Sequence, residues 1–300
     1  MSQPPASAPK NWGEIRHPRG GRSQFLTVLG KIARYLALFA LTIIFLFPFY
    51  IIIRNSLMTE AEITNFNAWQ WLPKSPQWGN YSDVFEDDLI SMSTGLRVSA
   101  TLAIINLVLQ TLFASMAGYA LARIPFKGRE FVFFLILLTL MIPGAVTFVP
   151  TFVVVSELGG ISTLWGIVVP GLFNAFATFL FRQFYLDFPT EIEEAGRLDG
   201  NSYFGVYWKL LLPNSLGIMA ALGILSFIYS WNAFLWPVIV GQSSDTRTVQ
   251  VVLSSYLTAQ TIDLTRLFAG AAIGAAPLII VFLVLQRYIV QGVRMSGIKG

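Results

Sequence analysis

The sequence predicts an all-α integral membrane protein with six transmembrane helices. Of its 300 residues, 55% are hydrophobic and only 12% are charged, whereas soluble domains carry roughly 25% charged residues. The mean hydropathy is +0.63. This composition leaves too few charges to cover a surface that faces water, and it excludes a disordered chain. Alternating strands of the barrel type are not visible, so the segments that cross lipid should be helices, which satisfy their backbone hydrogen bonds internally.

Stretches without Lys, Arg, Asp or Glu place the six helices. A helix needs about 20 mostly apolar residues to cross a bilayer. The expected spans are 35–53, 98–122, 131–156, 158–181, 215–240 and 267–286. The third span contains Pro143 and Pro150, so we expect it to be kinked or broken. Together the spans and their connections form a transmembrane domain over residues 25–290.

The basic residues predict that both ends of the chain are cytoplasmic. In that orientation 15 of the 20 Lys and Arg residues lie on the inner side, as the positive-inside rule requires. Residues 1–24 are polar and rich in proline, and we expect a disordered cytoplasmic tail there rather than a signal peptide. Residues 291–300 are expected to form a second cytoplasmic tail. This topology accounts for the net charge of +4 without a nucleic-acid partner.

Several function classes are disfavoured by what the spans lack. They contain no Asp, Glu, Lys, Arg or His, whereas proton- or ion-coupled carriers usually place ionisable groups in the membrane. The chain has no cysteine, so it has no thiolate metal site and no Cys nucleophile. It also lacks a P-loop, since the nearest match, 292–297, is followed by Ile298 and Lys299. We therefore expect no catalytic residue, no bound metal and no nucleotide site, and any ATP hydrolysis must occur on another polypeptide.

The outer connection between the first two spans, 55–97, carries Trp69, Trp71 and Trp78. Tryptophan at this level of a membrane protein usually anchors the chain at the lipid–water interface. A docking surface for an external partner is the alternative interpretation.

The inner connection 182–213 carries the most specific pattern. Thr190 and Glu193 have the spacing of a capping box at the start of a helix. Acidic residues in the first turn suit the positive end of the helix dipole, and Gly200 suits the left-handed position after the last turn. The segment should therefore form a short acidic helix in the cytoplasm. The helix could lie on lipid headgroups or fit a groove on a soluble partner, and anionic inner leaflets disfavour the first.

This connection resembles the EAA motif of ABC importer permeases, E-A-A-x-x-x-G followed by nine residues and I-x-L-P. The matching residues, with the spacing intact, are Glu194, Ala195, Gly196, Gly200, Leu210, Leu212 and Pro213. Two of them depart from the motif, since Gly196 replaces an Ala and Leu210 replaces an Ile. The string 230–237 resembles S-W-N-x-F-x-W-P of the carbohydrate-uptake, maltose-type branch. The ending 286–300 resembles the second permease of that branch.

The resemblance implies the ABC importer type I permease fold and a subunit of a binding-protein-dependent, ATP-driven sugar importer that works by alternating access. It implies a bacterial or archaeal cytoplasmic membrane. The implied partners are a second homologous permease, a dimer of ATP-binding subunits that holds ATP and Mg²⁺, and an external solute-binding protein. A polyol or a glycerol-3-phosphate-like solute is the alternative cargo. A membrane-embedded enzyme or scaffold of a different class is a further alternative, for which the sequence offers no cluster of ionisable residues.

The resemblance also implies roles for particular residues. The inner helix would be the coupling helix, whose contacts with the ATPase would come from Glu194, Ala195, Gly196, Asp199 and Gly200. The C-terminal contact with the ATPase would come from Gly297 and Lys299.

A substrate path is expected where flat aromatic faces and hydrogen-bonding groups occur together, because sugars expose both C–H faces and hydroxyls. Such residues are Tyr229, Ser230, Trp231, Asn232, Phe234, Trp236 and, in the fourth span, Asn174, with Asn106 and Gln110 as weaker candidates. The alternative is that these aromatic side chains pack against neighbouring helices and the partner permease.

Overall fold

The computed structural model describes residues 21–65, 67–86, 91–258 and 262–296. These residues are helical except for their connections and one isolated antiparallel bridge, between Leu257 and Ile262. Three helices are long and apolar enough to cross a membrane, and three bent helix pairs raise the number of spans to as many as six. The predicted all-α class is therefore confirmed, with a span count that agrees with the hydropathy pattern.

The described residues divide into two units, one that ends at Ile51 and a second that begins at Ile52, which we call the main unit. The described part of the first unit belongs to helix α1 (Gly21–Ser56). This helix begins within the predicted tail 1–24, of which residues 1–20 lie outside the described residues. Most large apolar side chains of α1 are exposed in the isolated chain. That pattern is typical of a helix surrounded by lipid.

The main unit begins with two short helices, α2 (Glu60–Thr64) and α3 (Gly79–Asp83). The second span consists of α4 (Met92–Ile105), the π-helical turn η1 (Asn106–Gln110) and α5 (Thr111–Arg123). The third and fourth spans consist of α6 (Arg129–Leu140), α7 (Gly144–Glu157), α8 (Leu164–Val168), the 3₁₀ turn η2 (Val169–Gly171) and α9 (Ala175–Leu186).

The inner connection contains α10 (Thr190–Leu198), α11 (Tyr203–Val206), the π-helical turn η3 (Tyr207–Leu211) and α12 (Leu212–Asn214). The remaining elements are α13 (Leu216–Trp231), α14 (Leu235–Val240), the 3₁₀ turn η4 (Ser244–Thr246), α15 (Val249–Ser255) and α16 (Leu264–Ser296). Helix α16 continues into the predicted tail 291–300, of which residues 297–300 lie outside the described residues.

Breaks interrupt three of the expected spans. Helices α6 and α7 meet at an angle of 101°, and Pro143 is the N-cap of α7, so the predicted break occurs at this proline. The segment of α8 and η2 meets α9 at 45°. The expected fifth span, 215–240, is not one helix, because α13 ends at Trp231 and a separate helix, α14, follows. Asparagine side chains, those of Asn174 and Asn232, lie at the second and third of these breaks.

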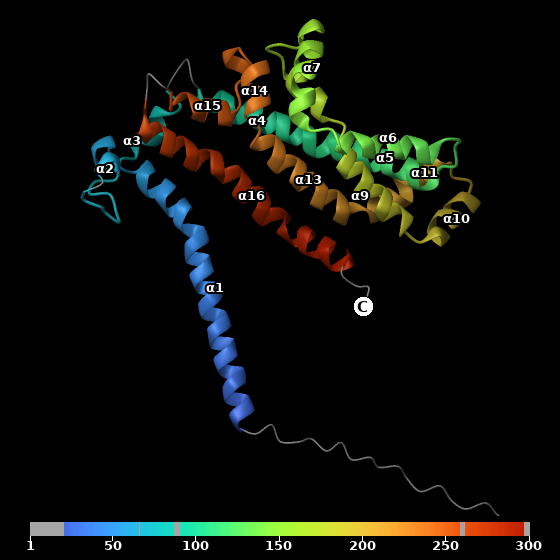
Figure 1. Ribbon diagram of the computed structural model, residues 1–300, viewed down its shortest axis with the longest axis horizontal. Helices are drawn as coiled ribbons and strands as arrows, with labels where there is room; N and C mark the ends of the chain where they lie inside the picture. Colours follow the sequence, from blue (N-terminus) through green and yellow to red (C-terminus); the bar gives the residue numbers. More distant parts are fainter. Residues whose placement is uncertain (1–20, 66, 87–90, 259–261, 297–300) are drawn as a thin grey trace, which may run out of the picture. The chain divides into compact units, whose positions relative to one another are not determined.

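The closest helix packing in the main unit is between α5 and α9, which lie side by side in Figure 1. Gly118 of α5 permits it, because a Cβ atom there would lie 2.5 Å from Cβ of Phe181 and 2.8 Å from the backbone nitrogen of Arg182. Arg182 in turn reaches α6, where both of its distances to the Glu130 carboxylate oxygens are 2.9 Å. Its guanidinium lies 4.0 Å from the centre of the Phe133 ring.

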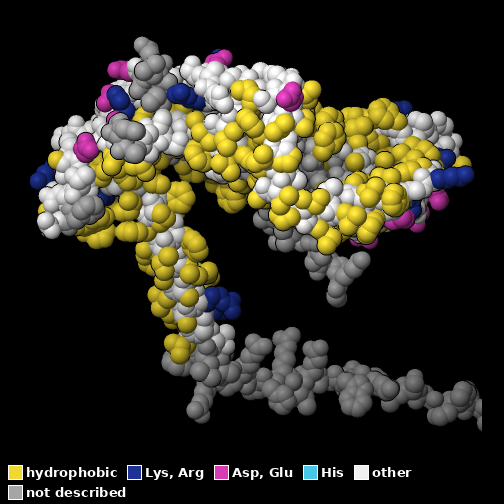
Figure 2. All heavy atoms as spheres, turned by 45° about the horizontal axis from the view of Figure 1, so that its top comes forward, with side chains coloured by type: hydrophobic (Ala, Val, Ile, Leu, Met, Phe, Trp, Pro, Cys, Tyr) yellow, Lys and Arg dark blue, Asp and Glu magenta, His cyan; other side chains and the backbone are white. Residues whose placement is uncertain are grey.

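The surface of the main unit separates charged from apolar side chains. Figure 2 shows hydrophobic side chains across the middle of the unit, with most Lys, Arg, Asp and Glu side chains towards its two ends, one of which is the end where α10 and α11 lie. Large apolar side chains such as Leu135, Val149 and Leu225 are exposed in the isolated chain. A lipid bilayer or a second membrane subunit would cover such a band.

The packing at Gly118 generates a stability prediction. We expect Gly118→Ala to lower the free energy of unfolding by about 1–3 kcal/mol, because α5 and α9 must separate to admit the methyl group. Gly217→Ala is the matched control, since a Cβ atom on that helical residue meets no atom within 4 Å. The measurement is the thermal unfolding midpoint of both variants in the same detergent. Equal midpoints for the two variants would contradict the prediction.

Candidate functional site

The start of α10 differs from the capping box that the sequence predicts. Pro189 occupies the N-cap position and Thr190 is already the first helical residue, without a side-chain cap. The predicted pairing of Thr190 with Glu193 is therefore wrong. The physical reason is that the Glu193 carboxylate is buried and has a different partner, the guanidinium of Arg123 on α5.

The end of α10 agrees with the prediction. Gly200 has a φ angle of 84°, which is the left-handed conformation that glycine adopts without a steric cost. The backbone nitrogen of Gly200 donates to the carbonyl of Arg197, and that of Asn201 donates to the carbonyl of Gly196. These two hydrogen bonds form a Schellman motif. The helix therefore has a fixed end directly after Asp199.

The buried face of α10 is attached to α5 through charged and polar groups. Nε of Arg123 lies 3.7 Å from Oε2 of Glu193, and the hydroxyl of Tyr119 donates to Oε1 of the same carboxylate at 3.5 Å. Arg123 also donates to the carbonyls of Tyr185 and Phe188, at the end of α9. One guanidinium therefore links the second span, the fourth span and α10.

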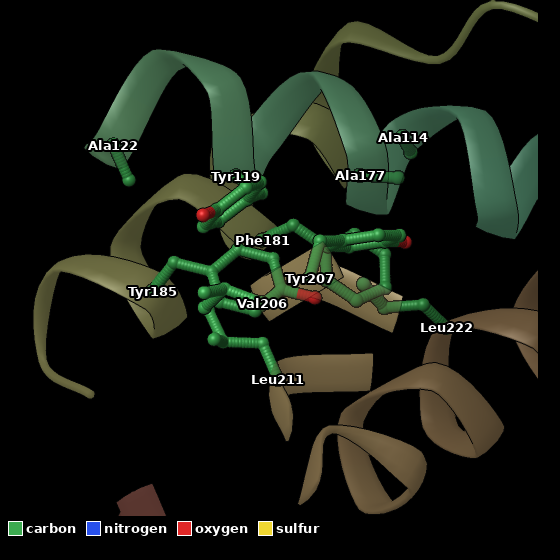
Figure 3. Packing of buried hydrophobic residues seen from close by; sticks show 10 residues of the cluster. All are labelled: Ala114, Tyr119, Ala122, Ala177, Phe181, Tyr185, Val206, Tyr207, Leu211 and Leu222. Atoms are coloured by element: carbon green, nitrogen blue, oxygen red, sulfur yellow. The ribbon is translucent and has the colours of Figure 1, made fainter. Parts of the chain in front are cut away.

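Beneath this attachment lies a buried cluster of aromatic hydroxyls from three elements. Oγ of Ser115 is 2.7 Å from the hydroxyl of Tyr185 and accepts from the hydroxyl of Tyr207 at 3.0 Å. The ring of Tyr119 lies 5.3 Å from that of Tyr207. The single hydroxyl hydrogen of Tyr119 is shared between Glu193 and the carbonyl of Tyr203, whose oxygen lies 3.2 Å from the hydroxyl. Figure 3 shows Tyr119, Tyr185 and Tyr207 converging from α5, α9 and η3. Because every hydroxyl has a partner, the connection after α10 is fixed to the helical core.

The outer face of α10 carries four of the five residues that the resemblance assigns to coupling. Glu194, Ala195, Asp199 and Gly200 are exposed. Gly196 is buried on the opposite face, where an added Cβ atom would lie 2.4 Å from Cδ1 of Leu210. The structure therefore places Gly196 at the attachment of α10 to η3 and not on its exposed surface.

Sequence reasoning missed Leu198 as part of this exposed face. Its side chain is 89% exposed at the last turn of α10. A large apolar side chain between Arg197 and Asp199, in a helix with an otherwise acidic outer face, is the signal that could have identified it.

A cavity of about 310 Å³ lies elsewhere in the main unit, between the second, third, fourth and fifth spans. Its lining residues are Leu102, Asn106, Gln110, Gly144, Thr147, Phe148, Thr151, Ile167, Val168, Pro170, Gly171, Ser226, Tyr229, Ser230, Ala233, Trp236 and Pro237. Of the residues predicted for the substrate path, Tyr229, Ser230 and Trp236 are brought together here. The weaker candidates Asn106 and Gln110 also line this cavity.

The π-helical turn η1 brings its two amide side chains to this cavity. Nδ2 of Asn106 donates to Oγ of Ser230 at 3.1 Å. Gln110 donates to the carbonyl of Gly171 and accepts from the hydroxyl of Ser226. These contacts join η1 to α13 and η2. π-helical turns inside α-helices occur frequently at functional sites.

The other predicted path residues do not line the cavity. Trp231 is 1% exposed and its indole donates to the carbonyl of Gly274 on α16 at 3.0 Å, so it packs against a neighbouring helix. Asn232 is exposed and donates to Ile228 in its own helix. Asn174 caps α9 by accepting from the backbone nitrogen of Ala177, and Phe234 is exposed next to α14.

Two further expectations concern the ends and metal binding. Gly297 and Lys299 lie outside the described residues. Within the described ranges, His, Asp and Glu side chains do not form a group of three or more that could hold a metal ion.

Comparisons with known proteins agree on one family. The family model of the binding-protein-dependent transport system inner membrane component matches residues 110–295. The chain is similar to the arabinooligosaccharides transport system permease protein AraQ of Bacillus subtilis, with 32% identity over 271 residues, 90% of this chain and 96% of that protein. It is also similar to the sn-glycerol-3-phosphate transport system permease protein UgpE of Yersinia pestis, with 30% identity over 83% of this chain and 91% of that protein.

Two more comparisons extend this similarity. The lactose transport system permease protein LacG of Rhizobium radiobacter is 35% identical over 65% of this chain and 71% of its own length. Among solved structures, a chain of a bacterial ABC transporter involved in the import of the acidic polysaccharide alginate superposes with a TM-score of 0.78. The two chains are 23% identical, and the match covers 91% of this chain and 98% of the other. They therefore share a fold.

The two adjacent glutamates of α10 provide a matched pair of variants. We expect Glu193→Ala to accelerate amide hydrogen exchange in α10 by about tenfold or more, because removing one partner of a buried ion pair strongly destabilises the contact. Glu194→Ala is the control, since the side chain of Glu194 is exposed and should leave exchange unchanged. The measurement is hydrogen exchange of the peptide that covers 190–198. Identical exchange in both variants would show that the carboxylate of Glu193 does not hold α10.

Proposed function

This chain belongs to the family of binding-protein-dependent transport system inner membrane components, and we propose that it is the second of two permease subunits in an ATP-driven sugar importer. Family membership excludes the alternative of a membrane protein from another class. The single observation that best supports the coupling mechanism is the attachment of α10 to α5 and α9 through Arg123 and Glu193. A helix held in this way transmits force to the spans without bending independently of them.

In this proposal α10 is the coupling helix, and its exposed face docks on a separate ATP-binding subunit. Glu194 and Asp199 would meet donors on that subunit, and Ala195 and Gly200 would allow close approach. Leu198 would fill an apolar pocket of the partner, because an 89% exposed leucine gains free energy when it is buried. Gly196 would act from behind this surface, by letting α10 lie against Leu210.

ATP hydrolysis would occur entirely on the partner. The sequence has no P-loop, which supports a dimer of ATP-binding subunits that holds ATP and Mg²⁺. A second homologous permease would complete the membrane domain, and an extracytoplasmic solute-binding protein would deliver the cargo. Movement of α10 on ATPase closure would then shift α5 and α9 together and switch the side of the membrane to which the path opens.

The proposed location is the cytoplasmic membrane of a bacterium or archaeon, with α10 and both termini on the inner side. The excess of basic residues in the connections on that side supports this orientation. The C-terminal residues Gly297 and Lys299 would add a second contact with the ATPase.

The proposed cargo is a sugar. The names of AraQ and LacG refer to arabinooligosaccharides and lactose, which supports a carbohydrate. The name of UgpE refers to sn-glycerol 3-phosphate, and this similarity keeps a glycerol-3-phosphate-like cargo or a polyol as the second candidate.

Coupling through α10 is tested by adding bulk to its exposed face. We expect Ala195→Trp to abolish copurification of the ATP-binding subunits, because the indole would prevent close approach of the two surfaces. Ser244→Trp is the control, since Ser244 is also exposed but lies on η4, remote from α10 in the sequence and on the opposite side of the proposed membrane. The measurement is the ratio of subunits in the purified complex. A normal ratio together with normal uptake in Ala195→Trp would disprove docking at this surface.

The cargo is tested with the complete complex, including its binding protein, in proteoliposomes. We expect ATPase activity to rise with a neutral sugar from a panel that contains lactose, arabinotriose, glycerol and sn-glycerol 3-phosphate. A binding-protein-dependent importer should hydrolyse ATP faster when loaded binding protein docks. A rise with sn-glycerol 3-phosphate alone would replace the sugar assignment by the second candidate.

A further inference from the structure

We propose that the cavity between η1, α7 and α13 is a subsite for the transported solute that admits uncharged polyhydroxyl compounds and excludes anionic ones. The proposal rests on the proposed function, because it assumes that the chain transports a small polar solute. It goes further by assigning a binding site within this permease and by separating the two cargo classes that the relatives leave open.

The walls of the cavity carry no charged side chain, since its lining contains no Lys, Arg, His, Asp or Glu. Among the described elements that contribute to it, α4 and α7 carry one charged residue each, Arg97 and Glu157. Neither of these residues lines the cavity. A phosphate or carboxylate would therefore lose water there without gaining a cation, which is strongly unfavourable within a membrane protein.

Three polar side chains in the cavity lining already use their hydrogens within the protein. The hydroxyl of Thr147 donates to the carbonyl of Gly144 at 3.1 Å, and that of Thr151 donates to the carbonyl of Thr147 at 2.7 Å. The amide nitrogen of Asn106 donates to Leu102 and Ser230. With these hydrogens engaged, the remaining capacity of Asn106, Thr147 and Thr151 is oxygen lone pairs.

This distribution of donors and acceptors distinguishes the two classes of solute. A sugar or polyol hydroxyl donates one hydrogen, and the oxygen atoms of Asn106, Thr147 and Thr151 can accept it. An ionised phosphate presents only oxygen acceptors, and the cavity lining offers it no cation. Its oxygen atoms would lie opposite the acceptor oxygens of Asn106, Thr147 and Thr151. The hydroxyls of Tyr229 and Ser230, which also line the cavity, can still donate to a solute oxygen, so the exclusion of anions rests on the absence of charged side chains from the lining.

Three aromatic side chains form part of the cavity lining. Tyr229, which lines the cavity, is 80% exposed in the isolated chain. Phe148 and Trp236, which also line it, meet edge to face with ring centres 5.5 Å apart. The indole nitrogen of Trp236 donates to the carbonyl of Gly166, which fixes the orientation of its ring. Apolar ring surface next to hydrogen-bond acceptors suits a solute with both C–H faces and hydroxyls.

The natural absence of cysteine permits a test that does not require the identity of the cargo. Ala233→Cys places one thiol in the cavity lining, at a residue whose side chain has no polar atoms. Thr147→Cys places a thiol in the lining on a different element, α7. Each variant is purified in the complex, with partner subunits that carry no reactive thiols. It is then treated with a neutral reagent, 2-hydroxyethyl methanethiosulfonate, or an anionic one, 2-sulfonatoethyl methanethiosulfonate. Rates are normalised to those with free mercaptoethanol, and Gln242→Cys, at an exposed residue next to α14, is the control.

We expect the neutral reagent to react with both cavity thiols faster than the anionic one by about tenfold or more, because entry of a charge into an uncharged cavity is costly. The control thiol should show a ratio near one. Adding Thr151→Lys to Ala233→Cys should raise the relative rate of the anionic reagent. Equal normalised rates at both cavity thiols would overturn the exclusion of anions, and no reaction at either would overturn the subsite.

These outcomes are separate from those that test the proposed function. Loss of the sugar assignment would appear as an ATPase response to sn-glycerol 3-phosphate alone, whereas the reagents report on the cavity whatever the cargo is.

Discussion

The main unit depends on the contacts of one guanidinium, that of Arg123 at the end of α5. It binds the carboxylate of Glu193 on α10 and two carbonyls at the end of α9. A largely buried positive charge is costly without partners, and here the partners come from α10 and from the end of α9 with the residues that follow it. The arrangement therefore fixes α10 to the membrane helices. The close approach of α5 and α9 at Gly118 is what brings the carbonyls of α9 within reach of Arg123.

The breaks in the spans give the fold its second property, a polar cavity inside an apolar chain. Continuous helices would hide their backbone groups and present only side chains. The π-helical turn η1 instead places Asn106 and Gln110, and the last turn of α13 places Ser230, around one space. The amide–hydroxyl contacts that satisfy these groups also hold η1 against α13. Polarity and packing are thus provided by the same residues.

The sequence predicted the spans because lipid imposes a length and an apolar composition that can be counted directly. It predicted Gly200 because only a left-handed residue ends this helix with a Schellman motif. It could not predict the partner of Glu193, because the local spacing to Thr190 suggested a cap while the true partner, Arg123, lies 70 positions away in the chain. For the same reason the sequence could not show that the indole of Trp231 donates to the distant carbonyl of Gly274.

The contact between Gly196 and Leu210 gives a different meaning to the two positions that depart from the EAA motif. Read one at a time, they are two unrelated exceptions. In the structure these two residues contact each other. Gly196 lacks the methyl group of alanine, and Cδ1 of Leu210 occupies the space that this methyl group would need. An alanine methyl group at 196 would require Leu210 to move. Leucine and isoleucine have equal volume but branch at different carbons, so homologues should inherit the residues at these two positions together. Pairs of this kind would let covariation locate, in related permeases without a structure, the contact between this inner helix and the turn that follows it.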